Sequence, residues 1–131
     1  MTKGARVLVA DDSEELQDLL KRALERAGYV VTQAFTGFDM THAMMSDPLP
    51  DLVVLDVALP DADGRDLLSS LRKDTRTAAV PVVVWSGRDA DSDRRIALDL
   101  GAEDYVEKGA PSALVPRIER ILFRISQERR A

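Results

Sequence analysis

The stretch DLVVLDVALPDADG, residues 51–64, decides how the rest of the sequence is interpreted. Its first part, 51–56, places an apolar run between two aspartates, which is typical of a strand buried on both faces. The run ends in Asp56, and an acidic loop punctuated by Pro60 and Gly64 follows it. A carboxylate at the end of a buried strand is costly unless a cation or a hydrogen-bond donor pairs with it. We therefore expect Asp56 to find partners on distant parts of the chain.

Short apolar runs alternate with helical patterns on both sides of this stretch. Strands are predicted at 5–10, 29–34, 51–56, 80–86 and 104–108, and helices at 13–28, 37–46, 63–74, 93–101 and 112–129. Strands of this kind that alternate with helices form a parallel sheet covered on both faces, with right-handed crossovers. The prediction is an α/β fold, an open three-layer sandwich of five parallel strands and five helices. It forms one domain over residues 1–131, with a core at about 5–125.

Composition excludes several other classes of protein. No apolar stretch approaches the ~20 residues that a membrane span needs, and the N-terminus lacks a signal peptide. Cysteine is absent, which excludes disulfides and thiol chemistry and agrees with an expected cytoplasmic location. The net charge of −5 argues against nonspecific nucleic-acid binding. Residues 117–131 carry five Arg against two Glu, which is either a solvated helix face or a docking surface.

Four of the predicted strands end in polar or charged side chains. Asp11 and Asp12 follow the first strand, Asp56 ends the third, Ser86 the fourth and Lys108 the fifth. Ligands of an open α/β sheet bind beyond the carboxyl ends of the strands, so these side chains are expected to converge. Three carboxylates at one place repel one another unless a cation enters, and an all-oxygen acidic cluster suits Mg²⁺.

Each of these residues also has a plainer structural interpretation. Asp12 and Glu15 form an Asp-x-x-Glu pattern that caps helices, and Asp56 alone could be a turn residue. The first strand-to-helix turn, ADDSEE at 10–15, contains no glycine, whereas nucleotide and flavin sites use glycine-rich turns there. The turn therefore disfavours a phosphate-bearing cofactor and leaves a metal as the expected partner of the acids.

Four motifs lie at the ends of predicted strands, in an order and at positions that match a known family: VLVADDSEE (7–15), DLVVLDVALPDADG (51–64), VVVWSG (82–87) and DYVEK (104–108). Together they resemble the receiver domain of two-component response regulators, a chemotaxis-regulator-like and flavodoxin-like fold with strand order 2-1-3-4-5. The resemblance covers about residues 5–125. One departure is Gly109, since the family usually has proline after the lysine.

The resemblance implies a role for each site residue. Asp56 would be the phosphoacceptor, and the ligands of Mg²⁺ (or Mn²⁺) would be Asp11, Asp12, Asp56 and the backbone carbonyl of Ala58. Ser86 would supply the hydroxyl and Lys108 the cation that bind the phosphoryl group. Tyr105 would form the switch pair with Ser86, and phosphate lifetime would be tuned by Ala58 and Arg88. The chemistry suits these residue types, because a carboxylate is a competent nucleophile toward phosphorus and cations offset the charge on the transferring oxygens.

The implied function is a phospho-accepting receiver of a two-component system or phosphorelay, a switch that catalyses only its own phosphoryl transfer and autodephosphorylation. Implied partners are a sensor histidine kinase or phosphotransfer protein, and a downstream protein or output domain on the fourth helix, fifth strand and fifth helix. Direct nucleic-acid or membrane contact is not expected, and the chain would be a monomer or weak dimer. A pseudo-receiver that docks without phosphate is the alternative. A phosphohydrolase of the haloacid-dehalogenase type is disfavoured, because it needs an acid where this chain has Ala58.

Overall fold

The computed structural model describes residues 4–87, 91–109 and 111–130. Its strands are β1 (Arg6–Ala10), β2 (Val30–Ala34), β3 (Leu52–Leu55), β4 (Ala58–Leu59), β5 (Ala62–Asp63), β6 (Val82–Ser86) and β7 (Asp104–Glu107). Its helices are α1 (Glu14–Arg26), α2 (Gly37–Met44), α3 (Gly64–Lys73), α4 (Asp91–Asp99) and α5 (Pro111–Arg130). None of the helices in these ranges is both long and apolar enough to cross a membrane.

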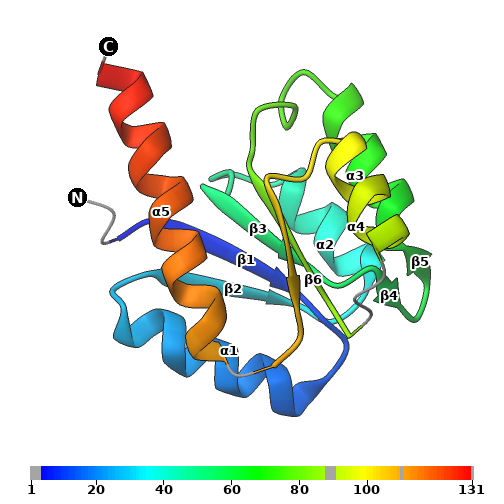
Figure 1. Cartoon of the computed structure of the whole chain (residues 1–131), viewed down its shortest axis with the longest axis horizontal. Helices are drawn as coiled ribbons and strands as arrows, with labels where there is room; N and C mark the ends of the chain where they lie inside the picture. Colours follow the sequence, from blue (N-terminus) through cyan, green and yellow to red (C-terminus); the bar gives the residue numbers. More distant parts are fainter. Residues whose placement is uncertain (1–3, 88–90, 110, 131) are drawn as a thin grey trace.

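The main sheet has five parallel strands in the order β2-β1-β3-β6-β7. Helices α1 and α5 cover one face of this sheet, and α2, α3 and α4 cover the other (Figure 1). The short strands β4 and β5 pair with each other in a separate antiparallel hairpin. Numbered along the main sheet alone, its strands follow the predicted 2-1-3-4-5 order, and the predicted three-layer sandwich is confirmed.

Strand β3 shows why a continuous apolar run forms the centre of such a sheet. Its side chains alternate between the two hydrophobic clusters: Val53 and Leu55 pack with α2–α4, whereas Leu52 and Val54 pack with α1 and α5. All four are fully buried. Burying one such side chain contributes about 1.5–3 kcal/mol, so both faces of the run stabilise the sheet. Because β3 is covered on both faces up to its last residue, Asp56, which follows it at the carboxyl edge of the sheet, is also buried.

The structure settles one alternative of the sequence analysis and adds one element to it. Ser13 is the N-cap of α1, its hydroxyl oxygen accepting a hydrogen bond from the amide of Leu16 at 3.2 Å. The capping interpretation that the sequence left open for Asp12 therefore does not hold. The β4–β5 hairpin was not predicted. It follows the loop after Asp56, and α3 begins at once behind it with Gly64, where a Cβ atom would lie 2.4 Å from the Cα of Val57. Only glycine allows the helix to start this close to the loop.

Candidate functional site: an acidic pocket at the carboxyl edge of the sheet

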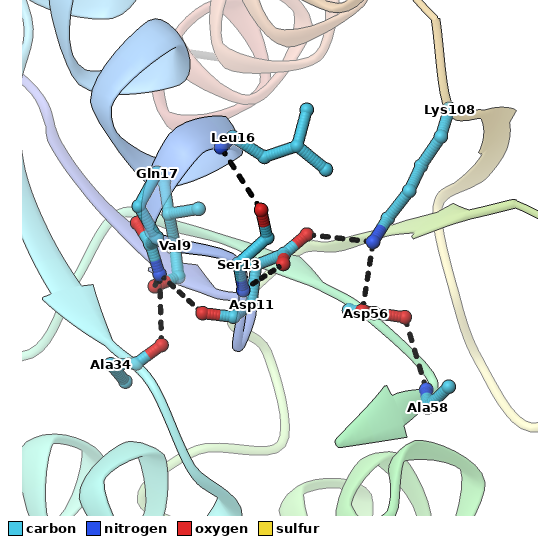
Figure 2. Close-up of polar contacts among 9 residues, drawn as sticks. All are labelled: Val9, Asp11, Ser13, Leu16, Gln17, Ala34, Asp56, Ala58 and Lys108. Atoms are coloured by element: carbon cyan, nitrogen blue, oxygen red, sulfur yellow. Dashed lines mark hydrogen bonds and ion pairs between the residues drawn. The ribbon is translucent and has the colours of Figure 1, made fainter. Parts of the chain in front are cut away.

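Asp11 lies directly after β1, the strand flanked by β2 and β3, and is fully buried. Its backbone N–H donates to the carbonyl of Ala34 at the end of β2, at 3.0 Å. Its Oδ1 atom accepts a hydrogen bond from the amide of Ser13 at 2.9 Å, which turns the chain into α1. Asp11 is therefore held on both sides by backbone, with its second oxygen directed toward the middle of the sheet edge (Figure 2).

Asp56 lies after β3, the next strand in the sheet, and only 4% of its surface is exposed. Its backbone N–H donates to the carbonyl of Ala10 at 2.9 Å, which continues the parallel pairing of β3 with β1. Its Oδ1 accepts a hydrogen bond from the amide of Ala58 at 3.0 Å. Because two neighbouring parallel strands end here, the carboxylates of Asp11 and Asp56 reach the same point.

Lys108, after the edge strand β7, is the cation that meets these acids. Its Nζ atom lies 2.9 Å from Oδ2 of Asp11 and 2.9 Å from Oδ2 of Asp56, as Figure 2 shows. Burial alone lowers the pKa of Lys108, but its hydrogen bonds and charge interactions with Asp56 and Asp11 outweigh that effect, and the net shift is upward. The backbone N–H of Lys108 also donates to the carbonyl of Ser86 at 2.6 Å, so the lysine is anchored to β6.

Asp12 completes an acidic cluster with a composition that fits a divalent cation. Asp11, Asp12 and Asp56 each offer a carboxylate oxygen, and these three oxygens lie within 4.8 Å of one another. Asp12 is exposed, so the cluster opens to solvent on its side. One lysine ammonium against three carboxylates leaves excess negative charge. Hard oxygen ligands, excess negative charge and an open side are the features that Mg²⁺ or Mn²⁺ requires.

The other predicted site residues that the structure describes are Ser86, Tyr105 and Ala58. Ser86 ends β6 and is buried, and in β7 Tyr105 is buried as well. The guanidinium of Arg94, on α4, lies 5.2 Å from the centre of the Tyr105 ring and donates to the Tyr105 carbonyl at 3.0 Å. Ala58 is exposed at the start of β4. Arg88 lies outside the described residues.

One residue beside the pocket escaped the sequence analysis. Gln17 on α1 is 1% exposed, and its amide group reaches the ends of β1 and β2. It lies on the same face of α1 as the buried Leu20 and Leu24. The spacing of i, i+3 and i+7 was therefore visible in the sequence, but only apolar residues were counted toward the buried face.

A doubly wound parallel sheet with an acidic pocket at its carboxyl edge defines the class of chemotaxis-regulator-like domains. Residues 7–119 match the response regulator receiver domain family, and the chain belongs to that family. This confirms the resemblance and the fold expected from the sequence motifs.

Individual relatives agree with this assignment. The transcriptional regulatory protein GltR of Pseudomonas aeruginosa is 37% identical over 122 residues, which cover 92% of this chain and 50% of the relative. The phosphate regulon transcriptional regulatory protein PhoB of Escherichia coli is 33% identical over 122 residues, which cover 92% and 53%. The chain thus spans about half the length of the curated relatives it matches.

Solved structures extend the likeness to three dimensions. The receiver domain of the Francisella response regulator 1452 superposes with a TM-score of 0.85 at 29% identity, covering 93% of this chain and 99% of that one. A CheY-like receiver domain protein from Methanospirillum hungatei gives the same TM-score at 27% identity, covering 96% and 99%.

Proposed function

We propose that the chain is a phospho-accepting switch in which Asp56 receives a phosphoryl group and thereby changes the protein's affinity for a partner protein. The observation that supports this most directly is the Lys108 ammonium between the carboxylates of Asp11 and Asp56, with a third acid beside them. A purely structural ion pair needs one acid per lysine. Three acids around one lysine cost stability, and such a cost is typical of a functional site.

Asp56 would act as the nucleophile. One of its carboxylate oxygens attacks the phosphorus atom, a new O–P bond forms, and the bond between phosphorus and the donor's leaving nitrogen or oxygen breaks with the electron pair departing on the donor. Lys108 offsets charge on the phosphoryl oxygens, and the Ser86 hydroxyl donates to one of them. Asp11, Asp12 and Asp56, with the carbonyl of Ala58, would hold Mg²⁺ or Mn²⁺, which neutralises charge on the same oxygens.

The conformational response would pass through β7 and α4. A phosphoryl group that takes Ser86 and Lys108 as partners acts on β6 and the end of β7, where Tyr105 is buried under Arg94. Moving that aromatic ring changes the contact between β7 and α4, and phosphorylation would shift the populations of two arrangements of the α4–β7–α5 surface. This surface is the proposed binding site for a downstream protein or output domain.

Several finer features of the function belong to the same proposal. The phosphodonor would be a sensor histidine kinase or phosphotransfer protein. The chain would act in the cytoplasm, as a monomer or weak dimer. Ala58 leaves room for the water that hydrolyses the acyl phosphate, and Arg88 would limit its access. The transcriptional regulators among the relatives suggest an output by gene regulation, through a partner and without direct nucleic-acid contact by this domain.

A phosphorylation assay separates this proposal from a pseudo-receiver. The protein is incubated with a small phosphodonor such as acetyl phosphate and Mg²⁺, and phosphoprotein is measured by intact mass. We expect one phosphoryl group on the wild type and none on Asp56→Asn. The matched control is Asp51→Asn, which changes the acid before the other end of β3, where Asp51 caps the amide of Arg6 at 2.7 Å. Asp51→Asn should be phosphorylated like the wild type.

A second measurement follows the conformational response. Beryllofluoride activates the DrrB receiver domain, which is 26% identical to this chain with a TM-score of 0.80. Beryllofluoride with Mg²⁺ should change the fluorescence of Trp85, which is fully buried beside Ser86. A chain that takes up no phosphoryl group and shows no fluorescence change under these conditions is a pseudo-receiver, and the proposal is then wrong.

A further inference from the structure

We propose that Gln17 is a positioning residue for the acidic pocket: its buried amide fixes the end of β1 and so sets the geometry in which Asp11 and Asp12 meet Asp56. The inference rests on the proposed function, because the pocket is taken to bind a divalent cation. The side-chain hydrogen bonds of Gln17 go to backbone carbonyls and not to the three carboxylates. Its role would be exerted through the backbone that carries them.

The contacts of Gln17 are unusual for a helix side chain. Its Nε2 atom donates to the carbonyl oxygens of Val9 at 3.0 Å, Asp11 at 3.0 Å and Ala34 at 2.9 Å, all drawn in Figure 2. An amide nitrogen carries two hydrogens, so three acceptors must share them. Its own oxygen, Oε1, is buried and has no hydrogen-bond partner among the described residues. Helix α1 therefore tolerates an unsatisfied oxygen in order to place a donor where three carbonyls converge.

These three carbonyls belong to the segment that carries the acids. Val9 and Asp11, which provide two of the carbonyls, are the residues before and after Ala10. The carbonyl of Ala10 itself accepts the amide of Asp56. That of Ala34 accepts the amide of Asp11, and so ties β2 to the same point. A single amide group thus holds the backbone of β1 on both sides of the residue to which the phosphoacceptor strand is bonded.

Removing the donor would take one hydrogen bond from each of the three buried carbonyls, although the carbonyl of Ala34 keeps the amide of Asp11. Losing hydrogen bonds to buried carbonyls is costly enough to make the backbone move or admit water. A displacement of the turn after β1 carries Asp11 and Asp12 away from Asp56, which is bonded to Ala10. Residues that orient metal ligands from outside the coordination sphere typically change metal affinity by 10–100-fold when they are replaced. We expect an effect of this size at the lower end, because Asp11 keeps its hydrogen bonds to Ser13 and Ala34.

The test is Gln17→Met, which keeps an unbranched side chain of similar length and removes the donors. Mn²⁺ binding to the full chain is measured without a phosphodonor, from the electron paramagnetic resonance signal of free Mn²⁺. The matched control is Gln33→Met, because Gln33 donates to the backbone carbonyl of Gln17 at 3.3 Å and to none of the three carbonyls. A second control is Leu24→Ala, which creates a cavity under α1 and lowers the urea midpoint.

We expect Gln17→Met to raise the Kd for Mn²⁺ about tenfold, whereas Gln33→Met and Leu24→Ala stay within about twofold of the wild type. If Gln17→Met does not fold, Gln17→Asn withdraws the amide by one methylene and should shift the Kd in the same direction. A positioning role is overturned if the folded variant keeps the wild-type Kd, or if Leu24→Ala shifts it equally. A wild type that binds no Mn²⁺ overturns the cation site itself, and is thereby distinguished from an error about Gln17 alone.

Discussion

Replacing the proposed phosphoacceptor by its amide, Asp56→Asn, is expected to stabilise the protein in metal-free buffer, and the distances around Asp56 allow an order-of-magnitude estimate of the effect. In the wild type the Asp56 carboxylate lies 2.9 Å from the Lys108 ammonium. At an effective dielectric constant of about 20 this attraction is about 6 kcal/mol. The same carboxylate has oxygens of Asp11 and Asp12 within 4.8 Å. At the limit of 4.8 Å each of these repulsions is about 3.5 kcal/mol on the same scale, and it is larger at a shorter separation.

The two repulsions together slightly exceed the one attraction. Removing the charge therefore yields a net gain of about 1 kcal/mol, which in a protein of this size raises Tm by about 4 °C. The amide oxygen of the mutant can still accept the hydrogen bond from Ala58, and Lys108 keeps its contact with Asp11. A neutral side chain also avoids the cost of burying a carboxylate, which acts in the same direction.

Urea unfolding with EDTA and with Mg²⁺ tests this reasoning. Mg²⁺ at ten times its Kd should stabilise the wild type by about 1.4 kcal/mol, whereas Asp56→Asn, which lacks one ligand, gains less. The advantage of the mutant should therefore shrink or reverse in Mg²⁺. Asp12→Asn serves as the control, because it relieves repulsion by an exposed acid without touching the Lys108 contacts. If Asp56→Asn is less stable than the wild type in EDTA, the attraction of Lys108 dominates and the crowded-acid argument is wrong.

Three further predictions concern Lys108 and two contacts elsewhere in the fold. Lys108→Met leaves two buried carboxylates without their cation and should lower the free energy of unfolding by about 3–5 kcal/mol in EDTA, with partial recovery in Mg²⁺; equal losses in both buffers would contradict it. Gly101→Ala places a Cβ 2.8 Å from Nε of Arg72 at a φ of +104°, and should cost about 1–2 kcal/mol in thermal unfolding. The backbone N–H groups of Gly37 and Phe38 at the start of α2 lower the pKa of Asp61 from 3.8. Its contribution is therefore present above pH 3.8 and lost as pH falls through the lowered pKa, so wild type and Asp61→Ala should differ in stability at pH 7 and converge in acid.

The fold could be predicted because its strands are apolar on both faces. Runs such as 52–55 and 82–86 have no polar face to turn to water, so a sheet covered on both sides is the arrangement that buries them. The β4–β5 hairpin could not be predicted, since its strands are two residues long and show no period. Its position depends on a tertiary contact, the carboxylate of Asp61 accepting the amides of Gly37 and Phe38.

The site could be predicted for a geometric reason: parallel strands end at one edge of the sheet, so residues that follow different strands meet there. That rule brought Asp11, Asp56 and Lys108 together, and the structure places them at ion-pair distance. Sequence could not distinguish the buried Asp11 from the exposed Asp12, because both follow the same strand and either could cap a helix. The spacing of Gln17 with Leu20 and Leu24 could place Gln17 on the buried face of α1, but it could not reveal its role, since the three carbonyls that accept from it belong to the backbone and leave no mark in the sequence.

The contacts of Lys108 also indicate how one side chain can serve both states of the proposed switch. Each oxygen of Asp56 accepts from one donor, Ala58 on Oδ1 and Lys108 on Oδ2, and keeps a second lone pair for attack on phosphorus. Asp11 would be among the residues that hold a divalent cation, and the positive charge supplied there would weaken the attraction of Lys108 to the carboxylates. Because its backbone is bonded to β6, the released ammonium stays within reach of an incoming phosphoryl group. Such an exchange of ion-pair partners requires a compact charge on a flexible stem, which explains why lysine suits this position and the planar, bidentate arginine does not.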